Sequence, residues 1–94
     1  MLTSFEPIPA HPGYFVSPSG QFRRGYTKII STPRNAAGNL LFVVQQDGKR
    51  KWYLAHRIVA AVFLGDVTGK IVRFRNGDPT DIRVENLEIV GAPM

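Results

Sequence analysis

The chain has 94 residues, a formal net charge of +5 and no cysteine. This length predicts one small domain, and the absence of cysteine excludes disulfides and Cys-based zinc sites. Hydrophobic residues make up 44%, which is typical of a globular chain and not of a disordered one. No apolar run reaches the roughly 20 residues of a membrane-spanning helix. The N-terminus lacks the features of a signal peptide, so we expect a soluble cytoplasmic protein.

The first third of the chain has short β-prone runs separated by turn residues. Residues 1–12 contain three prolines and predict an extended lead-in that covers part of the core. The runs at 14–17 and 21–24 flank a Pro-Ser-Gly turn and predict a hairpin. With a further short strand at 28–31, they make a small N-terminal hairpin module over residues 13–37.

The middle of the chain predicts a second hairpin followed by one helix. Residues 39–46 and 49–54 flank Asp47-Gly48, a pair that suits a type I′ turn because both central residues need positive φ. Residues 55–64 have apolar side chains at helical spacing, and Gly65 is the expected stop. The expected core face of this helix consists of Ile58, Val59, Val62 and Phe63.

The last third predicts two more short strands, at 71–74 and 87–90, joined through a turn-rich segment. The expected fold is therefore α+β, with small antiparallel β-hairpins packed on one central helix. We expect a single domain over residues 1–94, whose main unit comprises residues 38–90.

Three blocks, taken in order, resemble the phage-type HNH homing endonuclease family. Residues 13–23 resemble the family's small N-terminal module, in which Tyr-x-Val-Ser precedes glycine. His56-Arg-Ile-Val-Ala60 resembles the family's His-Arg-Leu-Val-Ala helix, and residues 71–90 resemble its active-site segment. The resemblance implies an HNH-like, ββα-metal-like domain. In the third block, the residues that match the family's segment are Gly77, Asp78, Asp81, Arg83, Glu85, Asn86 and Leu87.

The catalytic positions of that third block differ from the family. Its Asp-His or Asn-His pair reads Arg73-Phe74, and its acidic residue before glycine reads Asn76. In the family the His is the general base, and the residue beside it binds a divalent metal together with a side chain from a following helix. Phe cannot accept a proton, and Arg repels a cation. The chain also ends soon after Val90, where that helix would begin.

These differences lead to the expectation that the chain is not an enzyme. It would be an inactive, degenerate relative without metal or cofactor, in which His56, Phe74 and Asn86 form a vestigial site. His56 would bond the backbone at the helix start or pack at the sheet edge, and Asn86 would hold the loop. Asp78 and Asp81 would be turn residues bonding backbone amides. The less favoured alternative is a metal-dependent nickase that uses His56, Asp78, Asp81 or Asn86.

Twelve basic residues against seven acidic ones favour a polyanionic partner. Strand alternation places Arg73 and Arg75 on the outer face, with Phe74 in the core, so either arginine could contact a phosphate. The other interpretation is an ordinary solvated basic face. The candidate nucleic-acid contacts are Arg23, Arg24, Lys28, Arg34, Lys49, Arg50, Lys51, Arg57, Arg73, Arg75 and Arg83.

The sequence as a whole favours a nuclease-dead, phage-encoded DNA-binding protein, which holds the phosphate backbone through its basic hairpins. The alternative is a phage protein–protein interaction module, because a basic surface also suits an acidic host protein. Such a module would inhibit or redirect its target or serve in virion assembly. The sequence gives no reason to expect a membrane partner, and it leaves monomer and homodimer open, since edge strands could pair between chains.

Overall fold

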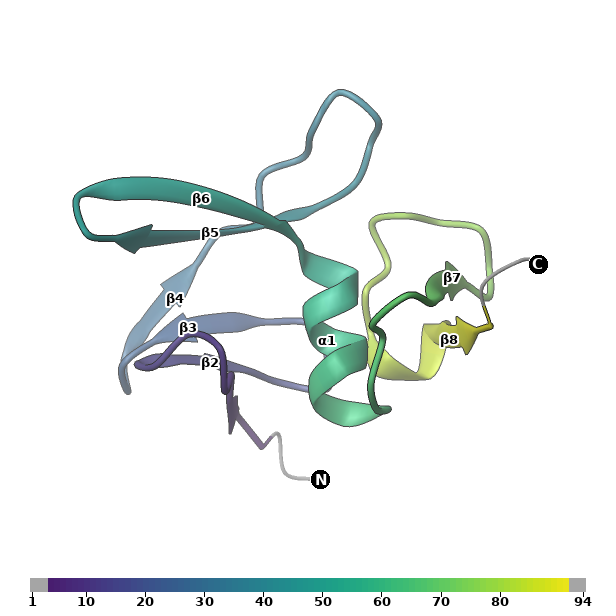
Figure 1. The fold of residues 1–94 in the computed structure, drawn as a ribbon, viewed down its shortest axis with the longest axis horizontal. Helices are drawn as coiled ribbons and strands as arrows, with labels where there is room; N and C mark the ends of the chain where they lie inside the picture. The colour runs from purple at the N-terminus through teal and green to yellow at the C-terminus, as the bar shows by residue number, and fades with distance from the viewer. Residues whose placement is uncertain (1–3, 92–94) are drawn as a thin grey trace.

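Three small antiparallel sheets surround one helix in the computed structural model, which describes residues 4–91 (Figure 1). This arrangement confirms the α+β prediction of small hairpins around a central helix. In chain order the elements are β1 (Glu6–Pro7), β2 (Tyr14–Val16), β3 (Phe22–Arg24), β4 (Lys28–Ile30), β5 (Leu41–Gln46), β6 (Lys49–Leu54), α1 (Ala55–Phe63), β7 (Ile71–Phe74), a 3₁₀ turn η1 (Val84–Asn86) and β8 (Leu87–Val90).

The first sheet has the strand order β1-β2-β3-β4. Its β2–β3 hairpin and the short strand β4 follow the prediction, whereas β1 was not predicted, because a two-residue strand containing proline has no periodicity to detect. Pro7 sits on the sheet edge, where proline is tolerated. Ile8 is only 3% exposed and belongs to the core, but residues 9–13 form turns, so the segment is not extended throughout. Residues 1–3 of the predicted lead-in lie outside the described residues.

The second sheet is the β5–β6 hairpin, paired from Leu41↔Leu54 to Gln46↔Lys49. Its turn residues Asp47 and Gly48 have φ of 53° and 75°, as the type I′ prediction requires. Phe42 on β5 is buried and stacks on Phe22 of β3, with ring centroids 4.6 Å apart. This contact joins the second sheet to the first.

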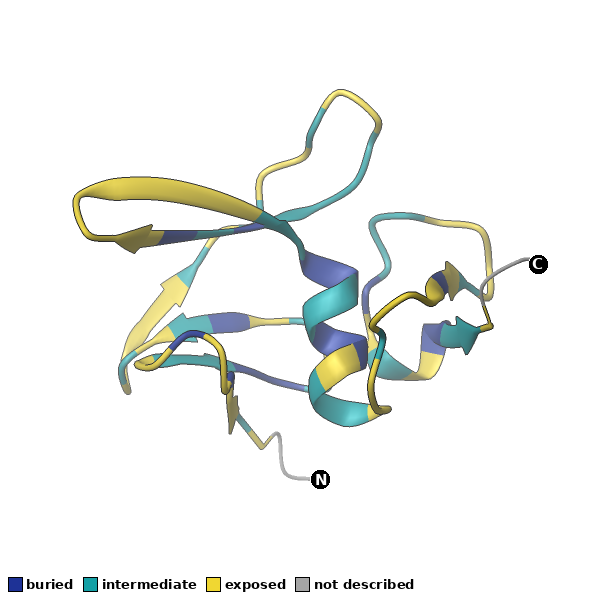
Figure 2. Ribbon diagram, viewed as in Figure 1, coloured by how far each residue is buried: buried dark blue, intermediate teal, exposed yellow. Residues whose placement is uncertain are grey.

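Helix α1 lies between the β5–β6 hairpin and the β7–β8 hairpin and contacts both (Figure 1). Its buried residues are Ala55, His56, Val59 and Ala60, seen as the dark blue parts of α1 in Figure 2. The predicted core face was therefore only partly right. Val59 is buried, but Ile58, Val62 and Phe63 are half-buried, because the helix packs on two sides and small residues allow the closest approach.

The helix ends as the sequence predicts, one residue earlier than its expected bound. The backbone N–H groups of Leu64 and Gly65 both donate to the carbonyl of Ala60, and Gly65 has a φ of 139°. No helix within residues 4–91 is long and apolar enough to cross a membrane.

The segment before β8 is fastened to the first hairpin. The backbone N–H of Val84 donates to the carbonyl of Pro18 over 2.8 Å. Ile82, which is 5% exposed, lies so close to Gly20 that a Cβ added there would be 2.6 Å from the Ile82 Cγ1. The β2–β3 turn and the loop that precedes β8 therefore form one packed unit.

Candidate functional site

The β7–β8 hairpin carries the Arg73-Phe74 pair. Arg73 is exposed and Phe74 is half-buried against the core, as strand alternation predicts. Arg73 lies opposite Glu88 in the register, and its Nη2 donates to the Glu88 Oε1 over 2.8 Å. This bond lowers the pKa of Glu88. Arg73 thus reaches the outer surface already paired with a carboxylate.

Asn86 organises the loop that leads from β7 to β8. Its side chain is buried, and its Oδ1 accepts from the backbone N–H of Asn76 over 3.0 Å. Its Nδ2 donates to the Asn76 Oδ1 and to the backbone carbonyl of Asp81, each over 2.9 Å. These three bonds fix both ends of the loop, which is the holding role predicted for Asn86.

Asp78 and Asp81 are turn residues, as predicted. The Asp78 Oδ1 accepts from the backbone N–H and the hydroxyl of Thr80. Asp81 accepts from the Nε and Nη2 of Arg83 over 2.7 and 2.8 Å, and this contact lowers the pKa of Asp81 to about 2. Both carboxylates are committed to local hydrogen bonds, and the Arg83 guanidinium is held by Asp81.

His56 is buried inside the fold and does not face the outer surface. It is 7% exposed, and its ring lies 4.7 Å from the Phe74 ring. Burial and then the nearby Arg57 charge lower its pKa, so the ring is held neutral. Its Nδ1 has no hydrogen-bond partner among the described residues. Packing against β7 is the role the structure shows; the alternative of a backbone bond at the helix start is not observed.

The side chains of His56, Asp78 and Asp81 of the nickase alternative lie in separate hydrogen-bonded or packed surroundings. Residues 4–91 contain no group of three His, Cys, Asp or Glu side chains placed to hold a metal. His56 packs on Phe74, whereas Asp78 and Asp81 bond to their own turns. Among the four residues of that alternative, Asn86 and Asp81 are in direct contact, because the Asn86 Nδ2 donates to the Asp81 backbone carbonyl.

Arg57 has a structural task as well. Its Nη1 and Nη2 donate to the backbone carbonyls of Lys70 and Val67 over 2.8 and 2.7 Å. The guanidinium thereby closes the turn between α1 and β7. This side chain was a predicted nucleic-acid contact, but its donors are used within the fold.

Arg23 and Arg24, two of the candidate nucleic-acid contacts, lie on opposite faces of the first sheet. Arg23 pairs with Phe15 in the register and has its guanidinium 4.0 Å from the centre of the Phe5 ring. Arg24 pairs with both Tyr14 and Lys28, so it lies on the opposite face. Strand alternation therefore separates the two neighbouring candidate contacts.

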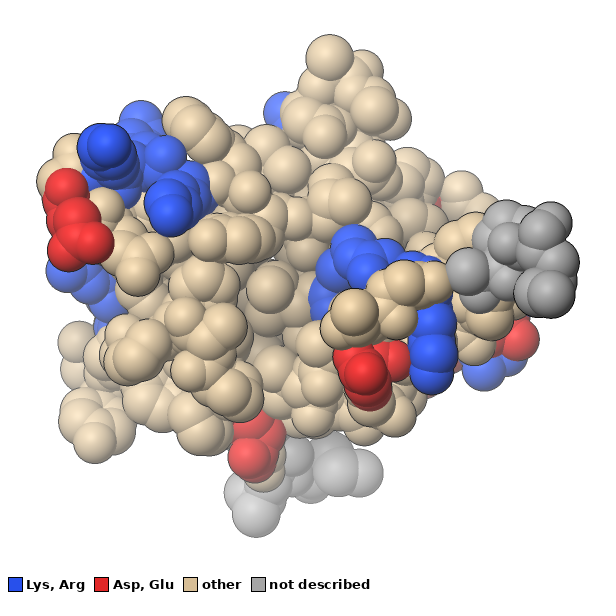
Figure 3. Space-filling view, viewed as in Figure 1, with Lys and Arg blue, Asp and Glu red and all other residues tan. Residues whose placement is uncertain are grey.

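The β5–β6 hairpin presents cations that have no carboxylate partner within residues 4–91. Its exposed residues include Lys49, Arg50 and Lys51, and the described ion pairs involve only Arg73 and Arg83. Figure 3 shows basic side chains gathered over the end of this hairpin. Arg50 lies 5.9 Å from the Trp52 ring centre, and Trp52 is 57% exposed. Arg34 and Arg75 are exposed elsewhere on the surface.

Comparison with known proteins identifies relatives of this fold. Residues 53–92 match the family described as HNH endonuclease. The structure is also similar to one reported as "DNA binding and cleavage by the HNH homing endonuclease I-HmuI", with a TM-score of 0.82 and 26% identity. The match covers 94% of this chain and 52% of that one, so the chain spans about half of that endonuclease. No curated protein matches the sequence.

These two matches confirm the predicted relationship to HNH endonucleases and overturn the expectation that the chain is not an enzyme. Both matches are to endonucleases, which are enzymes, and nothing in the structure shows inactivity. The expectation rested on three differences from the family motif, namely Arg73-Phe74, Asn76 before the glycine, and the end of the sequence soon after Val90. A proton acceptor and metal ligands can come from other segments of an endonuclease, so the Arg73-Phe74 pair does not decide the class.

Proposed function

We propose that this relative of the HNH endonucleases binds duplex DNA and that the β5–β6 hairpin makes the principal contact with the phosphate backbone. The observation that carries the proposal is the run of exposed cations at Lys49, Arg50 and Lys51, none of which is paired with a carboxylate within residues 4–91. Neutralising phosphates releases condensed counterions, which supplies much of the affinity of such proteins for DNA.

The shape of the hairpin supports this assignment. The β5–β6 hairpin projects beyond the helix in Figure 1, and a two-stranded ribbon fits the major groove of B-DNA. In the register, Arg50 lies opposite Gln45, and Trp52 lies opposite Val43 on the same face. Arginine and glutamine can donate to base edges, whereas the lysines on the opposite face suit phosphates.

The paired arginines supply a contrast within the same molecule. The guanidinium of Arg73 is held by Glu88, and that of Arg83 is held by Asp81. Each would have to give up its carboxylate to contact a phosphate, so its contribution to DNA affinity is expected to be smaller than that of a hairpin lysine. This difference makes the two arginines suitable control positions.

The test is the affinity of the purified protein for a fluorescent random duplex, followed by anisotropy. Between about 50 and 200 mM salt, several phosphate contacts should cost orders of magnitude in affinity. The variant Lys49→Gln/Arg50→Gln/Lys51→Gln should bind more weakly. Its salt slope, which is the steepness with which the logarithm of the binding constant falls with the logarithm of the salt concentration, should decrease by roughly 0.9 for each phosphate that is no longer neutralised. Affinity that does not change with salt would refute the proposal.

A double variant, Arg73→Gln/Arg83→Gln, provides the control. Because these charges are already paired, the salt slope of this variant should stay closer to that of the parent protein. If the control loses as much affinity and slope per removed charge as the hairpin variant, the phosphate contacts do not lie on the β5–β6 hairpin.

A further inference from the structure

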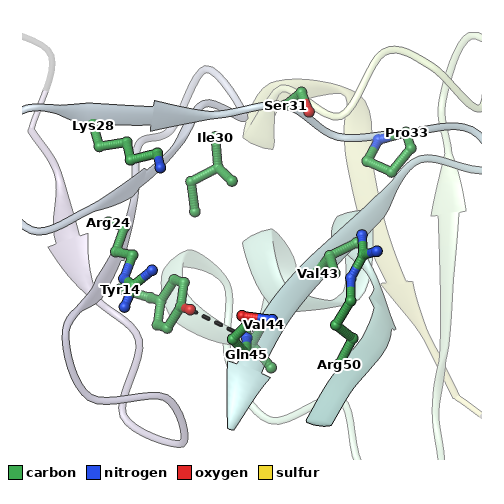
Figure 4. Close-up of a pocket in the computed structure, with 10 residues that line it drawn as sticks. All are labelled: Tyr14, Arg24, Lys28, Ile30, Ser31, Pro33, Val43, Val44, Gln45 and Arg50. Atoms are coloured by element: carbon green, nitrogen blue, oxygen red, sulfur yellow. Dashed lines mark hydrogen bonds between the residues drawn. The ribbon is translucent and has the colours of Figure 1, made fainter. Parts of the chain in front are cut away.

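A groove with a volume of about 370 Å³ lies between β4 and β5, outside the HNH-type segment. Figure 4 shows that its walls come from two different sheets. Strand β4 ends the first sheet, and β5 belongs to the two-stranded one, so neither strand has a β-strand partner on this side among residues 4–91. The Tyr14 hydroxyl crosses the groove and accepts from the backbone N–H of Gln45 over 3.3 Å.

One part of the groove wall is cationic. Arg24 and Lys28 are register partners on β3 and β4, whereas Arg50 of β6 lies across the groove from them, beside Val43 (Figure 4). No carboxylate lines the groove, and none of these three cations forms an ion pair with a described residue. Cations that line one cleft without a counter-charge create a positive potential that attracts an anion.

The remainder of the wall is largely apolar and includes Ile30, Pro33 and Val43. In Figure 4, Ile30 projects into the space between the strands, with Lys28 and Arg24 on one side of it. Sites for small ligands typically have volumes of about 300–1,000 Å³, mostly apolar walls and a few charged groups. A bare anion would use the cationic wall and leave the apolar wall unused.

A nucleotide matches both parts of this wall. Its phosphate complements the cations, and its base can lie against the apolar surface. The tyrosyl ring of Tyr14 adds an aromatic face, and bases stack on such faces without regard to sequence. A base inside a duplex is stacked and paired, so it could enter a groove of this size only after leaving the helix.

We propose that the groove between β4 and β5 takes one unpaired nucleotide, its phosphate held by Arg24 and Lys28 and its base against Ile30 and Val43. The inference rests on the proposed DNA binding and deepens it by naming the preferred substrate. DNA that carries an unpaired nucleotide should bind better than a continuous duplex. The β5–β6 hairpin would contact the flanking phosphates while the groove holds the unpaired nucleotide.

The first experiment uses small molecules and ¹⁵N-labelled protein. Deoxyadenosine 5′-monophosphate should shift the amide signals of Tyr14, Ser31 and Gln45, which line the groove. It should bind at least about tenfold more tightly than inorganic phosphate or deoxyadenosine alone, a ratio that corresponds to about 1.4 kcal/mol. Equal affinity for inorganic phosphate would reduce the groove to a bare anion site and overturn the inference, as would the absence of shifts at these residues.

A pair of charge-matched variants locates the site. Lys28→Gln should weaken binding of the monophosphate by about tenfold or more, because a charged hydrogen bond contributes more than a neutral one. Lys70→Gln removes the same charge from an exposed position that does not line the groove and should leave the monophosphate affinity unchanged. Equal losses in both variants would show a general charge effect and contradict the site.

The second experiment separates this inference from the proposed function. An intact duplex and the same duplex with one bulged nucleotide are compared by anisotropy, with the parent protein and with Lys28→Gln. The bulged duplex should bind more tightly, and Lys28→Gln should abolish most of that preference. Binding of both duplexes with equal affinity would overturn the groove inference alone. Binding of the monophosphate without any duplex binding would overturn the proposed function and leave the groove standing.

Discussion

Gly20 offers the sharpest test of how the two halves of the fold are joined. It lies in the turn between β2 and β3 and has a φ of 87°. A Cβ added at this position would lie 2.6 Å from the Ile82 Cγ1 and 3.1 Å from the Ile82 backbone oxygen. Ile82 is itself buried. The substitution Gly20→Ala therefore strains the backbone and also forces the loop before β8 away from the first hairpin.

The expected loss of stability has two parts. A left-handed conformation costs an L-residue about 1–2 kcal/mol. Inserting a methyl group into a packed contact typically costs about 1–3 kcal/mol. Gly20→Ala should therefore lower the free energy of unfolding by about 2–5 kcal/mol, which is a large part of the stability of a small domain. Relief through the flexible end of the Ile82 side chain is limited, because the backbone oxygen is also close.

Gly13 supplies the matched control. Its φ is 88°, but no atom lies within 4 Å of an added Cβ. Gly13→Ala should therefore show only the backbone part, about 1–2 kcal/mol. Urea denaturation followed by circular dichroism gives both values from the midpoint, provided that the m-value is unchanged. If the two variants lose the same stability, the close approach between Gly20 and Ile82 is not a real constraint.

A double-mutant cycle isolates the contact itself. Ile82→Ala removes the Cγ1 that an added Cβ at position 20 would meet. In that background Gly20→Ala should cost less than in the parent protein, with a coupling energy of about 0.5–3 kcal/mol. Strictly additive losses would contradict the steric contact, even with Gly20→Ala destabilising on its own for the backbone reason.

Three further outcomes follow from the buried and bonded side chains. Asn86→Ala should lower stability by about 1–3 kcal/mol and speed amide exchange at Asn76, because the loop loses all three side-chain bonds. Burial lowers the pKa of both His56 and His11, so the unfolded chain binds more protons and stability should fall as the pH drops below about 6.5. The variant His56→Gln should show a smaller fall below about pH 6.5 in thermal melts. Arg57→Lys should cost about 1–2 kcal/mol, because one ammonium replaces a fork that reaches two carbonyls.

Each of the three would be contradicted by a definite result. Unchanged exchange at Asn76 in Asn86→Ala would show that the loop is held by other contacts. An identical pH dependence in the parent protein and His56→Gln would show that His56 is not held neutral by the fold. Full stability in Arg57→Lys would show that the turn after α1 does not depend on the guanidinium.

The sequence by itself determined the elements that rest on contacts between neighbours in the chain. The turn at Asp47-Gly48 follows from the backbone freedom of two adjacent residues, and α1 follows from apolar spacing within about ten residues. The same is true of the Asp78 and Asp81 turns, whose side-chain bonds reach at most five residues along the chain. The resemblance to HNH endonucleases was also readable, because its three blocks are local motifs.

Only the tertiary structure decided how separate segments meet. The pairing of Arg73 with Glu88 occupies one predicted phosphate contact. The groove between β4 and β5 is formed by two sheets whose relative position depends on the stacking of Phe22 on Phe42. These contacts join residues far apart in sequence, and their partners are selected by core packing. Local propensity carries no information about that choice.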